Sequence, residues 1–566
     1  MRKGKGKRRG DGKRSREKEL RRLVGSGQLE AAEALLRPRL GAEPDPDALR
    51  WLGAIEFRRE RHAQALDAFG AAFALSPSAE LRGLSAQTLL AMGSSAVADR
   101  EAQAAIAMDD ATVQAWIVRA RVAEKDQRPE DALDHWRQAH ALAPDLSTVW
   151  GPLALALADC CAWDEVDELR QRLRRDLEKA RRTKRRPAFD PTVALYLGMT
   201  PEDVRLVAEL WFQTEAIASS SSPSSSRSRP RVAFMSPRLD AHPNGLLLQS
   251  VLRALGEHFE LTVIDWASRE DDVASRIRER AVHHVNLEGR STQSSLEALC
   301  ALDLDLLVDL GGFMAGQRLS LLAGRPARRT LHYLGSPNTM GGYVDTRLSA
   351  FDWNPPDQDA YFTEPLLRWR GPLVAVDELP AVPASDPPPR PAGSGPLFCN
   401  LASGYRLGRR SFERWMAVLQ DQPESRLWLA RGTKARRAHL RVAAEQAGVD
   451  PERIFFDYEG PLTGEYPMRA ADAWLDGVEI GAGTSGILCA WAGVPVVTSP
   501  GPTPWSRTGA AVVSAAGGEP ASDDSAYIRL ARSPGPAPRR DASLFDVGVF
   551  AQRFGAVLAR AARNSG

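Results

Sequence analysis

The sequence has few cysteines and no long hydrophobic run. Only five of the 566 residues are cysteine, and none of the five stands in a CxxC pair. This low density excludes a disulfide framework, favours a reducing compartment and leaves no structural zinc motif. No stretch of about 18 apolar residues is present, and the first residues lack the apolar core of a secretory signal. We therefore expect a cytoplasmic protein that does not span a membrane.

The charge of the chain is almost balanced. It carries 74 lysine and arginine residues against 72 aspartate and glutamate residues, a formal net charge of +2. No global positive field marks a nucleic-acid binder, so we expect neither nucleic acid nor a membrane as partner. The exception is a basic tail over residues 1–22, for which the composition predicts disorder. This tail leaves nucleic-acid binding open as an alternative, which a steep salt dependence of binding would reveal.

A repeat occupies the first third of the chain. Trp116 and Trp150 stand about one period of 34 residues apart, and prolines recur at Pro44, Pro77 and Pro144. This pattern resembles tetratricopeptide repeats, and we expect about five helix pairs over residues 23–180. Such an array holds a polypeptide on its curved surface, and a helical spacer without a ligand is the alternative. The packing residues are Leu52, Gly53, Ala65, Phe69 and Ala72 in one copy, and Trp116, Ala132, Trp136 and Ala139 in another.

Two series of short apolar strands follow the repeats. A transition helix and a serine-rich linker (181–230) precede the first series (231–379), and a proline-rich bridge (380–396) precedes the second (397–566). Helix-period segments alternate with the strands, so each series predicts a Rossmann-like half with a parallel sheet. We expect an α-solenoid followed by an α/β GT-B fold, with ligands at the carboxyl ends of the strands. The expected strands are 231–236, 260–266, 303–310, 330–334, 397–401, 426–430, 453–456, 473–475 and 494–498.

A glycine-rich turn lies between a strand and a helix of the second half. Its sequence is Gly481-Ala-Gly-Thr-Ser-Gly486. Glycines permit close approach of the backbone, and the free N–H groups and positive dipole end of a helix start favour a phosphate. The turn therefore predicts a seat for a nucleotide or a sugar diphosphate. Such turns also occur in α/β proteins without this ligand, so the turn alone leaves both interpretations open.

One histidine stands at the ligand side of the first half. His242 lies in the loop that follows the first strand, just before Pro243 and an apolar helix. Histidine titrates near neutral pH, so it can serve as a general base or as a donor to a developing charge. The chain has nine histidines, and a structural role is the alternative for any one of them.

Four features together resemble the protein O-GlcNAc transferase family, which includes SPINDLY-type O-fucosyltransferases and bacterial relatives. They are the repeats, residues 231–243, Leu334-Gly-Ser-Pro-Asn-Thr-Met-Gly341, and the segment from Gly483 to Thr498. The resemblance covers nearly the whole chain after the basic tail. It implies a metal-independent, inverting transfer of a GlcNAc-like sugar to Ser or Thr hydroxyls of a polypeptide that the repeats select. The implied donor is a nucleoside diphosphate sugar, UDP-linked, and no cofactor is implied.

The resemblance also implies which residues form the site. His242 matches the family's active-site histidine, as a base or as a contact to donor and acceptor. Arg406 falls where the family has a lysine that neutralises the leaving diphosphate. The other implied binding residues are His283, which matches a second histidine lining the cleft, Thr339, Ser403, and the nucleotide contacts Gly483, Thr484 and Ser485.

Several positions depart from the family's pattern. Arg406 keeps the positive charge of the usual lysine and can fork onto two phosphate oxygens. Leu488 stands where the family has an aspartate for the ribose, Gly483 replaces a histidine and Ser403 replaces a glutamine. Each lost charged hydrogen bond costs about 1.5 to 3 kcal/mol. The alternative is therefore a catalytically degenerate scaffold whose repeats bind a protein partner, and restoring an aspartate at position 488 tests it.

No metal site is expected. Asp303 and Asp305 have the DxD spacing of metal-dependent transferases, but they begin an apolar strand and have no evident third ligand. A hard cation requires more oxygen ligands than this pair supplies.

Overall fold

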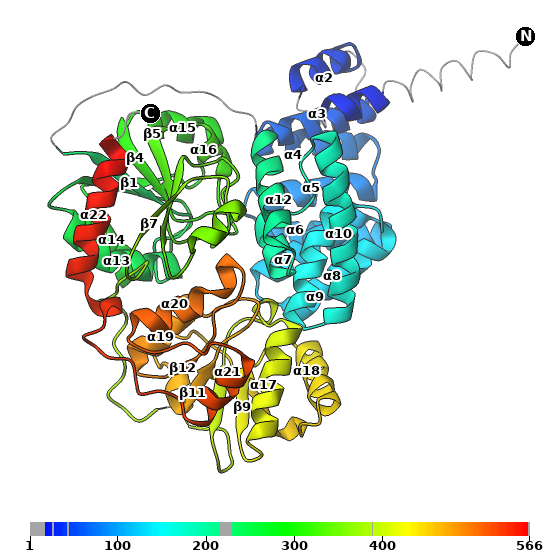
Figure 1. Cartoon of the computed structure of the whole chain (residues 1–566). Coiled ribbons are helices and arrows are strands. Elements are labelled where there is room, and N and C mark those ends of the chain that lie inside the picture. The colour runs from blue at the N-terminus through cyan, green and yellow to red at the C-terminus, as the bar shows by residue number, and fades with distance from the viewer. Residues whose placement is uncertain (1–16, 25–27, 42–44, 216–228, 388, 564–566) are drawn as a thin grey trace, which may run out of the picture. The chain divides into compact units, whose positions relative to one another are not determined.

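The computed structural model describes residues 17–24, 28–41, 45–215, 229–387 and 389–563 (Figure 1). Contacts divide the chain into two compact units, Met1–Leu153 and Ala154–Gly566. The serine run 219–228 lies outside the described residues, as does the basic tail up to residue 16. Residues 17–24 form a helix, whereas the composition predicts disorder through residue 22, because Leu20 and Leu23 are buried in a cluster with Trp51 and Ile55.

The first unit is built from helix pairs, as the repeat pattern predicts. Within the pair α3 and α4, Gly53 faces Phe69 so closely that a Cβ at Gly53 would lie 2.5 Å from the ring. Ala65 and Ala72, two further residues of the pattern, are fully buried. The expected repeat helices are thus confirmed. They are α2 (Leu29–Leu36), α3 (Pro46–Arg58), α4 (His62–Leu75), α5 (Ala79–Ala91), α6 (Ser95–Met108), α7 (Val113–Lys125), α8 (Pro129–Leu142) and α9 (Ser147–Asp159), which begins in the first unit and ends in the second.

Three helices lead into the α/β region: α10 (Trp163–Thr183), α11 (Pro191–Tyr196) and α12 (Pro201–Gln213). A capping box of Thr200 and Asp203 starts α12. Gly341, with φ +64°, approaches α12 so closely that a Cβ would lie 2.3 Å from the Ala208 carbonyl. The loop that contains Gly341 is therefore packed directly on this helix.

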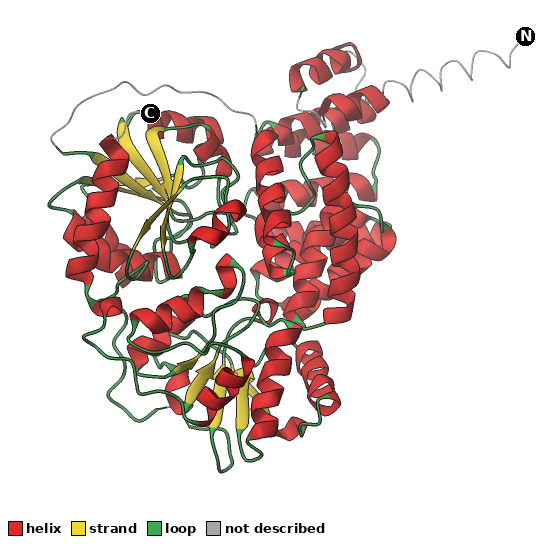
Figure 2. Cartoon of the chain, viewed as in Figure 1, coloured by secondary structure: helices red, strands yellow, loops and turns green. Residues whose placement is uncertain are grey.

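The first half of the α/β region is a parallel sheet with helices on both faces (Figure 2). Its strand order is β3-β2-β1-β4-β5-β6-β7. Val232 and Phe234 of β1 pack in one apolar cluster with α13, α14 and α22, while Ala233 and Met235 pack in another with α15 and α16. Burial on both faces is typical of parallel sheets. The strands are β1 (Arg231–Met235), β2 (Glu260–Asp265), β3 (His283–Asn286), β4 (Leu304–Asp309), β5 (Ala327–His332), β6 (Thr346–Ala350) and β7 (Leu366–Trp369); the helices are α13 (Pro243–Leu255), α14 (Asp272–Arg280), α15 (Thr292–Cys300), α16 (Leu319–Ala323) and α22 (Val547–Arg563).

The second half has a five-stranded parallel sheet of order β10-β9-β8-β11-β12. Leu397 and Cys399 face a cluster with α19, and Phe398 faces a cluster with α17, α18 and α21. The solenoid and the two parallel α/β halves confirm the expected fold class. The strands are β8 (Leu397–Asn400), β9 (Arg426–Ala430), β10 (Ile454–Tyr458), β11 (Ala473–Leu475) and β12 (Val496–Val497); the helices are α17 (Arg409–Asp421), α18 (Lys434–Gln446), α19 (Thr484–Ala492), α20 (Thr508–Ala515) and α21 (Asp524–Arg532).

All nine expected strands are present, with ends that shift by one or two residues at several of them and by three at the start of β5. Three strands of the first sheet were not expected, namely β3, β6 and β7. They lie at the two sides of the sheet; β3 and β7 are partly exposed, whereas β6 is buried at all but its first residue. All three carry histidine, arginine or serine in place of a continuous apolar run, which hides the strand signal.

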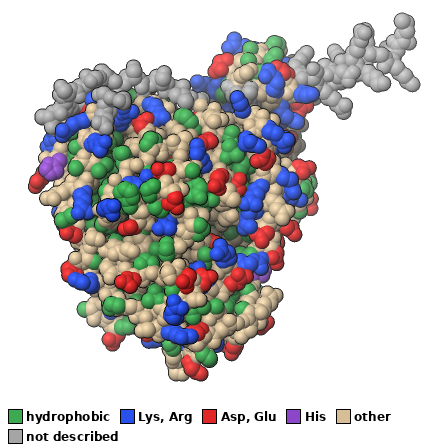
Figure 3. Space-filling model, in the orientation of Figure 1, with side chains coloured by type: hydrophobic (Ala, Val, Ile, Leu, Met, Phe, Trp, Pro, Cys, Tyr) green, Lys and Arg blue, Asp and Glu red, His purple; other side chains and the backbone are tan. Residues whose placement is uncertain are grey.

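Basic and acidic side chains are interspersed on the face drawn in Figure 3, in keeping with the balanced composition. Within the described part of the chain, no helix combines the length and the apolar character that a membrane crossing requires.

Candidate functional site

A small pocket opens at the carboxyl ends of β8 and β11. Asn400 joins the two strand ends, because its Nδ2 donates to the Leu475 carbonyl at 2.8 Å and its Oδ1 accepts from the Ala402 amide at 3.2 Å. The pocket therefore lies at the edge where doubly wound sheets bind ligands. Residues that line it include Arg406, Trp415, Trp474, Asp476, Ile480 and Ser485.

Arg406 is half-buried and ends a short 3-10 helix, Gly404–Arg406. Its Nη2 donates to the Gly481 carbonyl at 2.9 Å. The short helix rests on the end of α9: the Tyr405 amide donates to Asp159 Oδ1 at 3.3 Å, and a Cβ on Gly404 would lie 2.0 Å from the Asp159 carbonyl. The structure thus brings the arginine expected at the diphosphate beside the glycine turn expected to seat it.

The glycine turn ends at the start of α19. Gly483 is the N-cap, Thr484 is half-buried and Ser485 is buried. A Cβ on Gly481 would lie 2.7 Å from the Gly509 amide nitrogen, so a glycine at 481 lets the turn lie against the start of α20. Because Gly483 has no side chain to cap the helix, the N–H groups of the first turn of α19 are left for a ligand or for water.

Asp476 holds the glycine turn in place by hydrogen bonds. Its Oδ1 accepts from the amides of Gly477 at 2.8 Å and Ala482 at 2.7 Å, and its Oδ2 accepts from the Thr498 hydroxyl at 2.7 Å. Burial raises the pKa of Asp476 to about 6, while these hydrogen bonds and the charge of Arg406 oppose the rise. The carboxyl group therefore sets the shape of the turn and adds a negative charge close to Arg406.

Ser403 and Leu488, two positions of the second half where the sequence departs from the family's pattern, differ in exposure. Ser403 is exposed, and its carbonyl accepts from the Arg406 amide at 3.1 Å. Leu488 is buried in an apolar cluster with Trp474 and Ile487. The side chain at the predicted ribose position is thus part of the core.

His242 is the N-cap of α13, in the loop after β1. The Asn244 amide donates to its Nδ1 at 3.4 Å. Burial lowers the pKa of His242, the positive charge of Arg238 lowers it further, and Asp240 opposes both. The imidazole is therefore neutral at pH 7, the state that a base requires and in which one ring N–H can still donate.

The loop before His242 is held by two carboxylates. Arg238 makes a bidentate contact with the buried Asp240, at 2.7 and 3.2 Å, and the Arg269 amide donates to the same carboxylate at 2.8 Å. Burial raises the pKa of Asp240, but these donors outweigh it and hold the pKa below its usual value. Asp271 accepts from the Ala241 amide at 2.8 Å. The two residues directly before His242, Asp240 and Ala241, are therefore both anchored.

The structure does not bring His283 to the same edge of the sheet. His283 is the first residue of β3, with 53% of its side chain exposed, and its Nε2 lies 3.5 Å from Glu260 Oε1. Glu260 is the first residue of β2, whereas His242 follows the carboxyl end of β1. A cleft-lining role for His283 remains a prediction.

Thr339 lies in the loop 334–341, close to the strand ends, and is buried. Its hydroxyl donates to Glu364 Oε2 at 2.6 Å and accepts from the Gly341 and Thr363 amides at 3.2 and 3.0 Å. These partners use the hydroxyl inside the protein. Direct substrate binding by Thr339 stays a prediction, and in this structure the side chain shapes the loop.

Sequence reasoning missed two residues that support the site, Asn244 and Asp476. Each is a polar residue beside a strong landmark: Asn244 follows His242 and Pro243, and Asp476 directly follows an apolar strand and precedes a glycine. Both are nevertheless buried. A polar residue at the end of an apolar strand or the start of an apolar helix is the signal that identifies them.

Within the described ranges, no group of three or more His, Cys, Asp or Glu side chains is arranged to hold a metal ion. Asp305 instead pairs with Arg328 at 2.6 Å and accepts from the Arg231 amide at 2.8 Å.

Comparisons with known proteins show similarity to glycosyltransferases. Residues 393–554 match the family model described as glycosyl transferase family 41. A probable UDP-N-acetylglucosamine–peptide N-acetylglucosaminyltransferase SEC of Arabidopsis thaliana is 25% identical over 286 residues, which are 48% of this chain and 29% of the relative. The UDP-N-acetylglucosamine–peptide N-acetylglucosaminyltransferase of Caenorhabditis elegans is 32% identical over 106 residues, 18% of this chain and 9% of the relative.

A solved structure is similar over almost the whole chain. It is a mutant of the Thermobaculum terrenum O-GlcNAc transferase, with a TM-score of 0.63 and 21% identity, and the match covers 92% of this chain and 97% of that one. This likeness shows the fold: helical repeats followed by the two halves of a GT-B fold. The chain spans less than a third of the length of the two curated relatives. The family match over residues 393–554, the related sequences and the shared fold agree, and each shows that the chain is similar to glycosyltransferase family 41.

Proposed function

We propose that the chain is a protein O-glycosyltransferase, which moves a sugar from a nucleoside diphosphate sugar to a serine or threonine hydroxyl of a polypeptide. One observation carries the proposal: Arg406 and Ser485 line a single pocket at the start of α19. A cation beside a helix N-terminus suits an anionic diphosphate, which is the leaving group of such a donor. A UDP-linked, GlcNAc-like donor is proposed because the relatives are named as UDP-N-acetylglucosamine–peptide transferases.

The proposed reaction is a single displacement without a metal. The acceptor hydroxyl attacks the anomeric carbon from the face opposite the diphosphate, so the configuration inverts, and the bond to the diphosphate oxygen breaks. The hydroxyl proton passes to His242 if His242 is the base, and to an oxygen of the departing diphosphate if His242 is a donor. Arg406 and the first N–H groups of α19 stabilise the negative charge that develops on that oxygen. Arg406 is fixed by its hydrogen bond to the Gly481 carbonyl, and the turn before α19 is fixed by the hydrogen bond from the Ala482 amide to Asp476. Little reorganisation of these groups is therefore required during the reaction.

His242 serves the acceptor side in one of two ways. The Asn244 amide faces Nδ1, so the neutral ring carries its proton on Nε2 and offers an N–H donor to the site. A base needs the other tautomer, in which the acceptor proton passes to a free Nε2 and the 3.4 Å contact from Asn244 is lost. This contact is long, so the change of tautomer costs little. Both roles fit a neutral imidazole.

The acceptor is proposed to be a polypeptide held by the repeats, because stacked helix pairs present an extended concave surface. The alternative is a scaffold that binds a protein partner and transfers nothing.

The test is a ligand-induced thermal shift with a panel of nucleoside diphosphates and their sugars, on the wild type and on Arg406→Ala. A ligand that binds only the folded chain raises the melting temperature. We expect a shift with one nucleotide that disappears in Arg406→Ala and persists in Arg410→Ala, a matched change at an exposed arginine. Peptides incubated with the active donor then show the sugar by mass spectrometry. No shift across the panel at millimolar ligand would favour the scaffold.

A further inference from the structure

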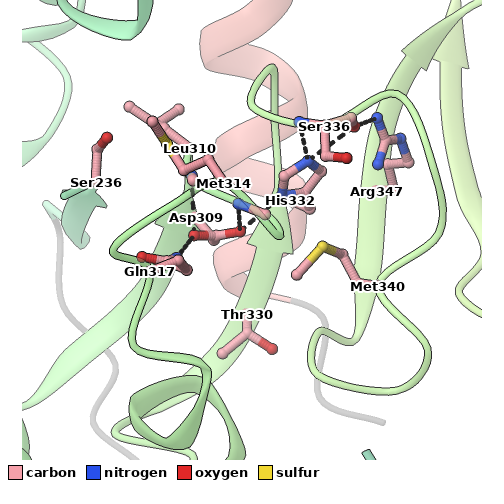
Figure 4. Close-up of polar contacts among 12 residues, drawn as sticks. Ser236, Asp309, Leu310, Met314, Gln317, Thr330, His332, Ser336, Met340 and Arg347 are labelled. Carbon is pink, nitrogen blue, oxygen red and sulfur yellow. Dashed lines mark hydrogen bonds and ion pairs between the residues drawn. The ribbon is translucent and has the colours of Figure 1, made fainter. Parts of the chain in front are cut away.

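We propose that the buried pair of Asp309 and His332 positions the loops of the first half that orient His242. This inference rests on the proposed function, since it assigns the pair to the support of the acceptor-side histidine. Asp309 ends β4 and His332 ends β5, where they stand directly opposite each other in the sheet (Figure 4). Both side chains are 0% exposed, so they act through other groups and not on a substrate.

Asp309 holds the loop 310–317 with its full capacity for hydrogen bonds. Its Oδ1 accepts from the Gly311 amide at 3.1 Å and from Gln317 Nε2 at 2.5 Å. Its Oδ2 accepts from the Gly312 amide at 2.9 Å and lies 2.7 Å from His332 Nδ1. A carboxylate offers about four acceptor sites, and all four are filled from inside the protein. The start and the end of this loop are therefore tied to one side chain.

His332 connects this loop to the loop 334–341. Its Nδ1 donates to Asp309, and its Nε2 lies 3.2 Å from the Ser336 carbonyl and 3.4 Å from the Ser336 amide. The ring therefore faces the Ser336 backbone in either protonation state. Arg347 completes the junction, because its guanidinium donates to the carbonyls of Ser336 and Asn338.

Arg347 is fully buried, and burial lowers its pKa to about 10 against the opposing charges of Glu364 and Asp309. Its charge is thus retained at neutral pH inside the protein. Asp309, Arg347 and Glu364 are charged groups that contact His332 or its loop. A buried network of this kind is stable only when its members are mutually satisfied, so it specifies one arrangement of the loops.

The loops 310–317 and 334–341 also contact each other directly, next to the pair of Asp309 and His332. A Cβ on Gly335 would lie 2.2 Å from the Leu310 carbonyl, and a Cβ on Gly312 would lie 2.7 Å from Ser336 Cβ. Both glycines have positive φ, +29° and +57°. Side chains at these positions would push the loops apart, so the close contact depends on glycine and on the pair below it.

The link to His242 passes through Asn244. Asn244 is 5% exposed, and its Nδ2 donates to the Leu310 carbonyl at 2.7 Å and to Ser236 Oγ at 3.1 Å. The same residue's amide faces His242 Nδ1. Leu310 directly follows Asp309, so a change at the pair moves the carbonyl that holds Asn244. This is a continuous path of contacts from His332 to the imidazole of His242.

The experiment replaces His332 by two residues of similar size. His332→Asn keeps an N–H donor near the Nδ1 position, and His332→Leu removes it. The readout is the rate at which diethyl pyrocarbonate modifies His242, followed by peptide mass spectrometry. We expect His332→Leu to raise this rate about fivefold or more, because losing a buried hydrogen bond of ordinary strength opens the loops by that factor. His332→Asn should stay near the wild type, and His283, which is largely exposed, should react at the same rate in all variants.

Two controls separate positioning from loss of stability. Leu299→Ala removes a fully buried side chain of α15, which ends before β4 begins, and should lower the melting temperature without changing the His242 rate. If His332→Leu does not fold, Gln317→Leu removes one donor to Asp309 from a half-buried site and should raise the rate by a smaller factor. An unchanged His242 rate in a folded His332→Leu or Gln317→Leu would overturn the proposal.

The kinetic arm links the pair to catalysis. With an active donor and acceptor, His332→Leu should lower kcat about tenfold and leave the donor KM nearly unchanged, since the donor pocket lies in the other half. Equal loss in His332→Asn and His332→Leu would contradict positioning through Asp309. Modification of His242 is measured without turnover, so it decides the role of the pair even if the chain transfers no sugar.

Discussion

Arg406 donates a hydrogen bond from Nη2 to the Gly481 carbonyl at 2.9 Å. This contact connects the short helix Gly404–Arg406 to the turn that precedes α19, although Arg406 and Gly481 are 75 positions apart in the sequence. The cation and the helix start are therefore held together by a contact within the protein. Such preorganisation is the condition under which a charge contributes most to a transition state.

Replacing Arg406 by Ala should lower kcat by about 10² to 10³, because it removes a preorganised charge from the leaving group. Arg406→Lys keeps the positive charge but cannot donate two parallel hydrogen bonds to the diphosphate, so we expect an intermediate decrease in kcat of about tenfold. Steady-state kinetics with the donor that gives the thermal shift measure both. A kcat of the alanine variant equal to that of the wild type would remove Arg406 from the mechanism.

If His242 is the base, the rate should depend on its ionisation. Its pKa lies below the usual 6.5, through burial and the charge of Arg238, so kcat/KM should be flat through pH 7 and fall only below that lowered pKa. Arg238→Leu removes the repulsion and leaves Asp240 unpaired, so both changes raise the pKa and the acid limb should move to higher pH. A limb that stays in place would mean that another group titrates.

The two roles open to His242 predict different variants. Gln can offer an N–H donor but cannot accept a proton at neutral pH. If His242 is a donor, His242→Gln should retain much more activity than His242→Ala; if it is a base, both should lose about 10² to 10⁴ in rate.

The sequence predicts the fold through local patterns. Apolar strands after glycine or proline breaks and the 34-residue repeat are visible without any tertiary contact, and the corresponding elements are present. β3 was not predicted from the sequence, because its four residues, His283 to Asn286, are mostly exposed and form the outer strand of the sheet. A strand that is stabilised by one neighbour and little burial has no periodic signal.

The candidate site is predicted only in part for a similar reason. Arg406 and the glycine turn belong to motifs that are continuous in sequence. The contacts that hold them come from distant segments, such as Asp159 under Gly404, and from Asn244 against Leu310 in the first half. Local sequence patterns do not show which distant residues will be in contact. Neither the contacts that support the site nor the pairing of Asp309 with His332 could therefore be predicted from the motifs.

Replacing Asp476 by Asn should change how stability depends on pH. The pKa of this carboxyl is raised to about 6 by burial, so its ionisation costs folding free energy as the pH rises through 6, and the contribution is fully present only below its unfolded value of 3.8. Asn can accept from the Gly477 and Ala482 amides and donate to Thr498 without a charge. Relative to the wild type, the variant should gain about 1 kcal/mol between pH 5 and pH 7.5 in urea unfolding. A difference that is constant with pH would contradict a buried, titrating carboxyl.

The glycines of the turn should not be equivalent. In Gly481→Ala, the new Cβ meets the Gly509 amide at 2.7 Å and Thr508 Oγ1 at 2.8 Å, so α20 must shift, at a cost of about 1 to 3 kcal/mol. In Gly486→Ala, the nearest atom is Val512 Cγ1 at 3.4 Å, and alanine inside a helix should stabilise by about 0.5 to 1 kcal/mol. Urea unfolding and nucleotide titration measure both variants. Equal effects would mean that the turn adapts to a side chain.

Replacing Leu488 by Asp tests whether the missing ribose aspartate explains a loss of donor binding. Leu488 is buried in the core of the second half with Trp474 and Ile487, so a carboxylate there meets apolar neighbours. We expect a loss of about 3 kcal/mol or more in unfolding free energy and no gain in nucleotide affinity. Leu488→Met is the control, with a change below about 1.5 kcal/mol. Tighter nucleotide binding by a stably folded Leu488→Asp would instead show that α19 can turn this position toward the pocket, and would make the wild-type leucine the defect of a degenerate donor site.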